Sequence, residues 1–299
     1  MKLFPVSILS DNLKIDFMGK KKVSFTITLI LIVASFFFLS SSNLNYGIDF
    51  TGGILIEARS ENSFELAAIR DSLNKLEVGE VSLQNLGSDK DLLIKIGGKT
   101  DLENEKIIEL IKSDLSLINK NIEYRKIDYV GPQVGKELIE NGVYASILSF
   151  LAIMIYIGFR FQWQYSVGLV LALLHDVIVS LGFLSVSQFE FNLTSIAAIL
   201  TIVGYSVNDS VVIFDRIREN IAKYKQNSIS EIINISLNQT LSRTILTVST
   251  TLLATLALIL FAGKTVESFA WVVFAGIIIG TYSSVYISAP ILIYFNLRK

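Results

Sequence analysis

The sequence predicts a membrane all-α bundle of six helices that carries one α+β domain outside the bilayer. The 299 residues are 52% hydrophobic and 18% charged, whereas a soluble domain carries roughly a quarter charged residues. The charges gather at the N-terminus, in residues 57–140 and in residues 215–243. The rest of the chain holds long apolar runs of membrane-spanning length, which predict a polytopic membrane protein.

The composition argues against several classes of protein. A net charge of -1 gives no support to a nucleic-acid partner. The chain has no Cys, which excludes disulfides and Cys-based metal sites, and its single His, His175, cannot form a multi-His site. Gly52-Gly53 and Gly97-Gly98 lack the spacing of a phosphate-binding loop. We therefore expect no cofactor, no metal and no nucleic acid.

The first apolar run covers residues 23–39 and follows the basic cluster Lys20-Lys21-Lys22. A secretory signal peptide has the same order of charge and apolar residues, but it ends in a small-x-small cleavage site. No clear cleavage site follows this run, and Ser40-Ser41-Ser42 is the nearest candidate. We interpret residues 23–40 as a retained membrane anchor that follows a cytoplasmic segment of residues 1–22.

Five further apolar runs follow the α+β domain, and each predicts a span. They cover residues 138–159, 165–186, 192–214, 244–261 and 269–295. The last run is long, which predicts tilt or a kink near Pro290. Residues 138–299 therefore form a five-helix transmembrane part, with a predicted cytoplasmic loop at residues 215–243.

Basic residues gather on one side of the six predicted spans. This side holds Lys20, Lys21, Lys22, Arg160, Arg216, Arg218, Lys223, Lys225, Arg298 and Lys299. The opposite short loops hold Glu190, Glu267 and one basic residue, Lys264. Because positive charge favours the cytoplasmic side, we expect an inner-membrane protein with both termini in the cytoplasm and residues 43–137 outside.

The pattern of residues 43–137 predicts a ferredoxin-like domain. Strands are predicted at residues 54–59, 81–86, 92–96 and 122–130, and helices at residues 64–76 and 102–118. This β-α-β-β-α-β order is the split motif of ferredoxin-like domains. The segment shows no catalytic pattern, so we expect it to contact a partner or a passing polypeptide.

Asp209 is the strongest candidate for a functional group inside the membrane. A charged side chain in the hydrocarbon core costs about 2.5–3.5 kcal/mol on insertion scales. Asp209 lies with Asn208 on the cytoplasmic side of the fourth predicted span, and Arg243 opens the fifth. We interpret Asp209 as a carboxyl group that exchanges protons with either side, and Arg243 as its counter-charge. A static buried hydrogen bond for Asp209 and a snorkelling Arg243 remain open alternatives.

His175 and Asp176 lie near the middle of the third predicted span. Adjacent side chains diverge by about 100° on a helix, so we do not expect both to face one point. They belong either to a proton relay or to the packing and hydrogen bonding of the bundle. Ser206 and Ser210 are candidate supporting polar groups, together with Asn208.

Two other groups of residues have structural interpretations. The charged cluster after the fourth span reads as a solvated helix end, and it comprises Asp215, Arg216, Arg218 and Glu219. Small residues of the fourth and sixth spans permit close helix contact, and they are Gly204, Ser206, Ser210, Gly276, Gly280, Ser283 and Ser284.

Six segments of the chain resemble one family. They cover residues 47–53 (GIDFTGG), 130–138 (VGPQVGKEL), 174–177 (LHDV), 204–220 (GYSVNDSVVIFDRIREN), 241–247 (LSRTILT) and 280–284 (GTYSS). Together they resemble the SecD/SecF family of the RND superfamily, in the family's order and over essentially the whole chain. Two departures are minor: Ser210 stands where Thr is common, and residues 263–267 lack a double glycine.

The resemblance implies a non-enzymatic accessory subunit of the Sec translocase. It implies a heterodimer with SecD, with twelve helices in all, that uses the proton motive force in late preprotein translocation and release. Further implied partners are the SecYEG channel, the SecA ATPase, YajC, YidC, an unfolded preprotein on the periplasmic side and membrane lipid. The resemblance also assigns Asp209 and Arg243 to proton movement, while sodium stays open as the coupling ion.

Two other functions fit the sequence less well. A small-molecule or lipid exporter of the same superfold would need a pocket, and the outer domain is too small to enclose a large one. An intramembrane protease would use Asp176 and Asp209, but the sequence lacks the Gly-x-Gly-Asp signature of presenilin-type enzymes.

Overall fold

A computed structural model of the chain describes residues 14–97, 103–119, 121–262, 266–295 and 297. The chain divides into two compact units, one formed by Met1–Asn45 and Ala145–Lys299 and the other by Tyr46–Tyr144. Some predicted features lie outside the described residues, namely the segment 1–13, Gly98, the helix start at residue 102, Lys264, Arg298 and Lys299.

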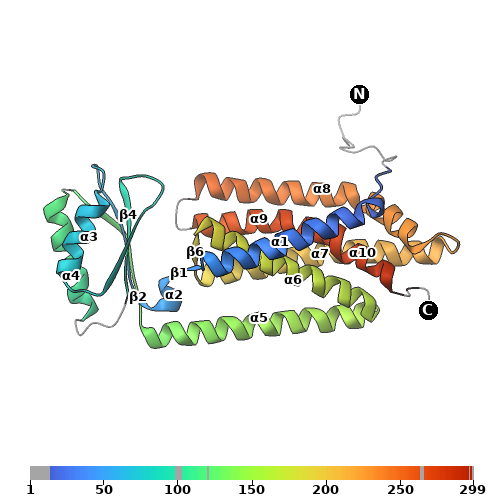
Figure 1. Cartoon of the computed structure of the whole chain (residues 1–299), viewed down its shortest axis with the longest axis horizontal. Helices are drawn as coiled ribbons and strands as arrows, with labels where there is room; N and C mark the ends of the chain where they lie inside the picture. The colour runs from blue at the N-terminus through green and yellow to red at the C-terminus, as the bar shows by residue number, and fades with distance from the viewer. Residues whose placement is uncertain (1–13, 98–102, 120, 263–265, 296, 298–299) are drawn as a thin grey trace, which may run out of the picture. The chain divides into compact units, whose positions relative to one another are not determined.

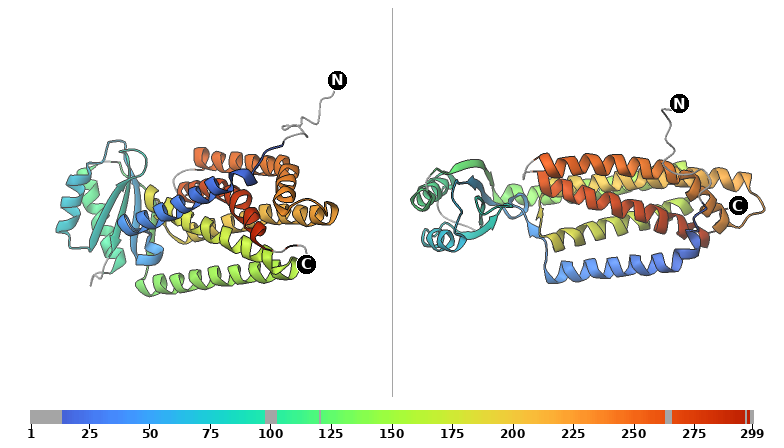
Figure 2. Two further views of the ribbon diagram at one scale, coloured as in Figure 1. Left: turned by 45° about the vertical axis from the view of Figure 1, so that its right-hand side comes forward. Right: turned by 90° about the horizontal axis from the view of Figure 1, so that it is seen from above.

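Six helices of the described chain are long and apolar enough to cross a membrane. They are α1 (Lys21–Ser41), α5 (Pro132–Arg160), α6 (Trp163–Ser187), α7 (Leu193–Lys223), α8 (Ile229–Phe261) and α9 (Glu267–Ser283) with its continuation. Within the first unit, which holds α5 only from Ala145 onward, these helices run alongside one another (Figures 1 and 2). The structure therefore confirms the predicted membrane helical bundle.

The helices differ in how much of their surface the chain itself covers. In the most apolar stretch of each span, 56% of the residues are buried in α6 and 61% in α9, against 6% in α5 and 11% in α8. Helices α6 and α9 thus form the centre of the bundle. Helices α5 and α8 present apolar surface to their surroundings, as lipid-facing or partner-facing helices do.

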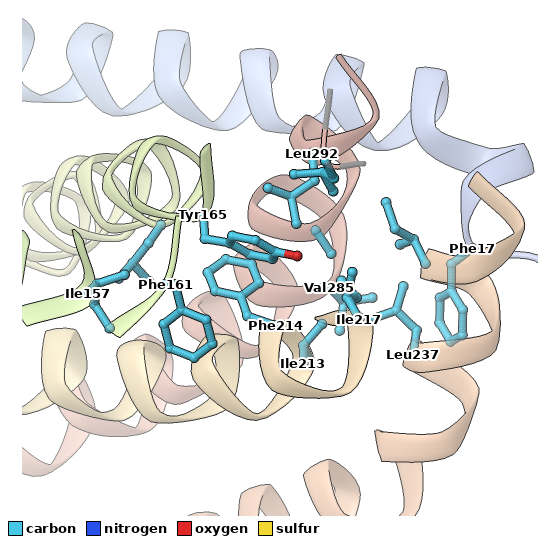
Figure 3. Packing of buried hydrophobic residues seen from close by; sticks show 14 of the residues in the cluster. Phe17, Ile157, Phe161, Tyr165, Ile213, Phe214, Ile217, Leu237, Val285 and Leu292 are labelled. Atoms are coloured by element: carbon cyan, nitrogen blue, oxygen red, sulfur yellow. The ribbon is translucent and has the colours of Figure 1, made fainter. Parts of the chain in front are cut away.

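Aromatic side chains close one end of the bundle core. The ring of Phe214 on α7 meets Tyr165 at 5.2 Å and Phe161 at 6.2 Å, both edge-to-face. Such pairs contribute about 0.5–1.5 kcal/mol beyond their buried area. Phe17, from the segment before α1, is also buried in this core (Figure 3). The described residues just before the first span are therefore packed against the bundle.

Residues 215–243, predicted as a loop, are mostly helical. Helix α7 continues to Lys223 and α8 begins at Ile229. Ser228 and Glu231 form a capping box, which satisfies free N–H groups in the first turn of α8. Ile217 and Ile233 are fully buried in the core, so these polar-looking extensions are amphipathic helices and not a flexible connection.

The last span loses its α-helical regularity just before Pro290. Helix α9 passes into a π-helix, η3 (Ser284–Ser288), then into α10 (Ala289–Ile291) and the 3-10 helix η4 (Leu292–Tyr294). Proline has no N–H to donate and its ring crowds the carbonyl group of the preceding turn. The predicted irregularity near Pro290 takes this form.

The second unit is built on a four-stranded antiparallel sheet. Its strands are β2 (Gly53–Arg59), β3 (Glu80–Asn85), β4 (Asp91–Gly97) and β5 (Glu123–Val130), in the order β3-β4-β2-β5. Helix α3 (Leu66–Lys75) lies between β2 and β3 in the chain, and α4 (Asn104–Ile118) lies between β4 and β5. Ile69 and Leu73 of α3 and Ile111 of α4 are fully buried in its core.

A one-turn helix, α2 (Ile48–Thr51), was not predicted from the sequence. Its Ile48 is buried with Leu55 and Leu93 in a separate small cluster. Gly52 and Gly53 follow with φ of 70° and 119°, a backbone conformation that glycine adopts without steric cost. A Cβ added at Gly53 would lie 2.2 Å from the backbone oxygen of Ile96. The double glycine therefore allows the turn into β2.

Two short strands, β1 (Asn45–Tyr46) and β6 (Glu190–Phe191), form a separate sheet. Near them, the side chain of Asn45 donates to the carbonyl oxygen of Gln188 at 2.9 Å.

Candidate functional site

Asp209 lies where three segments of the bundle meet. It is 7% exposed and belongs to α7. Thr244 of α8 donates its hydroxyl to Oδ1 at 2.8 Å, and Ser284 of η3 donates to Oδ2. A buried carboxylate needs such donors, because an uncompensated charge is costly in low dielectric. Asp209 thus ties α7 to α8 and to the irregular segment of the last span.

Asp176 of α6 forms a second buried carboxylate centre. It is fully buried. Its Oδ2 accepts hydrogen bonds from the hydroxyls of Ser206 and Ser283, each at 2.7 Å. Its Oδ1 lies 3.0 Å from Nδ1 of His175, which makes a further hydrogen bond. The centre therefore connects α6 with α7 and α9.

The structure corrects the expectation that His175 and Asp176 would not meet. Their Cα–Cβ bonds diverge, but both side chains are long enough to bend toward each other across the helix surface. The other ring nitrogen of His175, Nε2, is buried and has no hydrogen-bond partner among the described residues. The ring lies 6.0 Å from that of Tyr282, whose hydroxyl donates to the carbonyl oxygen of Ser24 on α1.

The remaining predicted site residues lie elsewhere. Arg243 is exposed, and no salt bridge joins it to Asp209 although both residues are described. It lines a groove of about 470 Å³ with Arg160 and Arg216. Asn208 is exposed. Ser210 is buried, but its hydroxyl lies 3.3 Å from that of Ser288 and not against a carboxylate.

The charged end of α7 matches its interpretation as a solvated helix end. Arg216 pairs with Glu219 and Arg218 with Asp215, each at 2.9 Å and each three residues apart. All four side chains are between 41% and 56% exposed. Surface pairs of this kind contribute little to stability.

Sequence reasoning missed the roles of three hydroxyl residues. Thr244, Ser283 and Ser284 donate to the two carboxylates, in addition to Ser206. From the sequence, Ser283 and Ser284 are predicted only as small packing residues. The sequence feature that points to them is a hydroxyl side chain inside a predicted span, because a buried carboxylate needs a hydrogen-bond donor there. Among the described residues, no group of three His, Asp or Glu side chains is placed to hold a metal ion.

Comparison with known proteins gives the family. The model of "Protein export membrane protein SecD/SecF, C-terminal" matches residues 110–298, and that of the "SecD/SecF GG Motif" matches residues 37–63. The chain belongs to the SecD/SecF family. Gly52 and Gly53, with their positive φ angles, lie within the second match. Family membership and six helices of spanning length make the chain a multi-pass inner-membrane protein.

The curated relatives of this SecD/SecF-family chain are protein translocase subunits, not enzymes. "Protein translocase subunit SecF" of Rickettsia rickettsii (strain Sheila Smith) is 55% identical over 300 residues, which cover 100% of this chain and 97% of that protein. The subunit of the same name from Rickettsia prowazekii (strain Madrid E) is 54% identical and 96% covered.

Two solved structures share the fold. A crystal structure of SecDF, described as a translocon-associated membrane protein, from Thermus thermophilus has a TM-score of 0.87 and 35% identity over 96% of this chain. A crystal structure of SecDF in a super-membrane-facing form has a TM-score of 0.71 and 34% identity over 97% of this chain. The chain spans 39% of each of those longer chains.

Proposed function

We propose that this chain forms half of a heterodimer with SecD and uses the proton motive force to promote late steps of preprotein translocation and release. In this proposal both termini face the cytoplasm, and the unit Tyr46–Tyr144, a ferredoxin-like domain, faces the periplasm. The similar SecDF chains are longer than this one, which covers 39% of each. A partner of the SecD type would supply the missing part and cover apolar faces that this chain leaves exposed.

The buried carboxylate of Asp209 carries the proposal. It accepts hydrogen bonds from two hydroxyls that belong to two other segments of the bundle. When the carboxylate takes up a proton it loses its charge, and the hydrogen bonds from the two hydroxyls become weaker. Ion binding at Asp209 would thus change the preferred arrangement of α7, α8 and η3.

Arg243 and the Asp176 centre have supporting roles in this proposal. Arg243 lines a groove open to solvent, beside Thr240 and near the Asp209 donor Thr244. In another state of the transport cycle, the guanidinium of Arg243 would attract the ionised carboxylate of Asp209. In the arrangement described here, it would repel cations from that carboxylate. His175 and Asp176 form the second proton-binding centre, supported by Ser206.

The proposed partners follow from the family. They are SecD, the SecYEG channel, SecA, YajC and YidC, with an unfolded preprotein on the periplasmic side and membrane lipid around the spans. Both similar structures are of SecDF, and one of them is described as translocon-associated. Copurification of the chain from native membranes, with SecD expected to accompany it, tests the first of these partners.

The Asp209→Asn variant tests the mechanism. Asn keeps the size of the side chain and an accepting oxygen but cannot ionise. We expect assembly with SecD to persist while export driven by the ion gradient falls to the level seen without a gradient. The measurement is the release of a secretory protein from membrane vesicles, with a proton or a sodium gradient imposed separately.

Asp215→Asn is the matched control, because Asp215 is an exposed carboxylate on the same helix. We expect this variant to export like the native chain. Gradient-dependent export that survives Asp209→Asn would contradict the proposed role. The gradient that drives export in the native chain identifies the coupling ion.

A further inference from the structure

Two neighbouring serines link the two buried carboxylates. Ser283 is the last residue of α9 and Ser284 the first of the π-helix η3. Ser283 donates to Asp176 and Ser284 to Asp209. Both serines are fully buried. One peptide unit therefore joins the hydroxyl of one centre to the hydroxyl of the other.

Each of these hydroxyls has a second acceptor on the preceding turn. The Ser283 hydroxyl lies 3.0 Å from the carbonyl oxygen of Gly280, and the Ser284 hydroxyl lies 3.0 Å from that of Thr281. A hydroxyl carries one proton, so it donates either to its carboxylate or to its carbonyl. The backbone N–H of Ser284 bonds the same two carbonyl oxygens. The three donors therefore compete for two acceptors.

The backbone at this junction is suited to a small rearrangement. π-Helical segments interrupt the regular hydrogen bonding of an α-helix and occur frequently at functional sites. Ser288, at the other end of η3, donates to the carbonyl oxygen of Ser284 at 2.8 Å. The second link between the centres, from Ser206 to Asp209, runs along α7, which is regular throughout and holds both residues at constant spacing.

The charged and titratable groups that face the two centres come from few elements. Arg243 of α8 and Tyr205 of α7 interact electrostatically with Asp209. His175 of α6 bonds Asp176, and Tyr282 of α9 stacks near His175. Among the described residues, none of these groups hydrogen-bonds to both carboxylates, whereas the Ser283-Ser284 pair does so through its two hydroxyls.

We propose that Ser283 and Ser284 are positioning residues that couple the ionisation of Asp176 to that of Asp209. When one carboxylate is protonated, its serine turns to the carbonyl group of the preceding turn. The backbone N–H of Ser284 then competes with this hydroxyl for the same carbonyl oxygen, and the α9–η3 junction shifts. This shift changes the length of the hydrogen bond from the other serine to the other carboxylate. The inference rests on the proposed function, in which Asp209 takes up the coupling ion.

Infrared titration of the full chain in complex with SecD tests the coupling. The carboxyl band of Asp209 is identified by its loss in Asp209→Asn, and its titration midpoint is measured with and without Asp176→Asn. We expect Asp176→Asn to move the midpoint by about half a pH unit, a roughly threefold change in proton affinity. In a Ser283→Ala or a Ser284→Ala background we expect less than half of that movement.

Ser180→Ala is the matched control background, because Ser180 is a buried serine on α6 whose hydroxyl has no partner among the described residues. It should preserve the full movement. An equal movement in the native, Ser283→Ala and Ser284→Ala backgrounds would show direct electrostatic coupling and overturn the inference, as would no movement at all. Using both serine variants keeps the test decisive if one of them fails to assemble.

The export assay with Asp209→Asn separates this inference from the proposed function. Export that depends on Asp209 without serine-dependent coupling rejects the inference and leaves the proposed function intact. Serine-dependent coupling in a chain whose export does not need Asp209 rejects the proposed function instead.

Discussion

The contact between α6 and the π-helix η3 depends on a glycine, and this makes a quantitative prediction. A Cβ added at Gly168 of α6 would lie 2.7 Å from the backbone oxygen of Ser288, about 0.7 Å short of ordinary van der Waals contact, which starts at 3.4 Å. The neighbouring atom is backbone, so it cannot turn away as a side chain would. Gly168→Ala therefore requires α6 and η3 to separate.

The magnitude follows from two opposing effects. Overpacking of this kind costs about 1–3 kcal/mol, while replacing Gly by Ala inside a helix gains about 0.5–1 kcal/mol. We expect Gly168→Ala to lose about 1.3 kcal/mol of stability, the difference between the midpoints of those two ranges, within a full span of about 0–2.5 kcal/mol. Gly204 of α7 is the matched control, because a Cβ there meets nothing within 4 Å, and Gly204→Ala should be neutral or slightly stabilising.

The assay is equilibrium unfolding of the isolated chain in detergent micelles, followed by the fluorescence of Trp163 and Trp271. If Gly168→Ala proves as stable as Gly204→Ala, then α6 and η3 do not pack as closely as the structure shows.

Two further predictions concern the second unit and the N-terminal segment. Leu73→Ala should destabilise the second unit by about 2–5 kcal/mol, because Leu73 is fully buried in the core of that unit. The measurement is thermal unfolding followed by circular dichroism, with Leu117→Ala, at an 84% exposed position, as a control that should change little. Equal unfolding midpoints for the two variants would refute the assigned core. The Gly19 N–H, followed by the Asn234 amide, holds the pKa of the exposed Asp16 carboxyl below its usual value. Its stabilising effect is then fully present above the unfolded pKa of about 3.9 and is lost as the pH falls through the lowered folded value. The stability of the native chain should therefore fall relative to that of Asp16→Asn on acidification from about pH 5 to pH 3, and parallel pH profiles for the two chains would contradict this.

Hydrophobic runs and turn residues were enough to predict the six spans and the main strands and helices of the second unit, but not the short elements α2, β1 and β6. Spans were predictable because a membrane helix must be continuously apolar over its length. The strands of the second unit were predictable because they are short runs with apolar residues that lie between turn residues. The extent of α7 and α8 was not predictable from hydropathy. Their extensions carry charge on one face and bury Ile217 and Ile233 on the other, and composition averaged over a window does not separate the two faces.

From its residues alone, the chain was expected to hold Asp176 and Asp209 in spans where each needs hydrogen-bond donors, because the cost of a charge in hydrocarbon does not depend on which helices pack together. The identity of those donors depends on how the helices pack. Ser284 lies 75 residues from Asp209, and Ser283 lies 107 residues from Asp176. A hydrogen bond spans only about 3 Å, so these partners meet only because the helices cross at this point. The π-helical turn also places the hydroxyls of two adjacent serines against different carboxylates. No local pattern in the chain encodes that geometry.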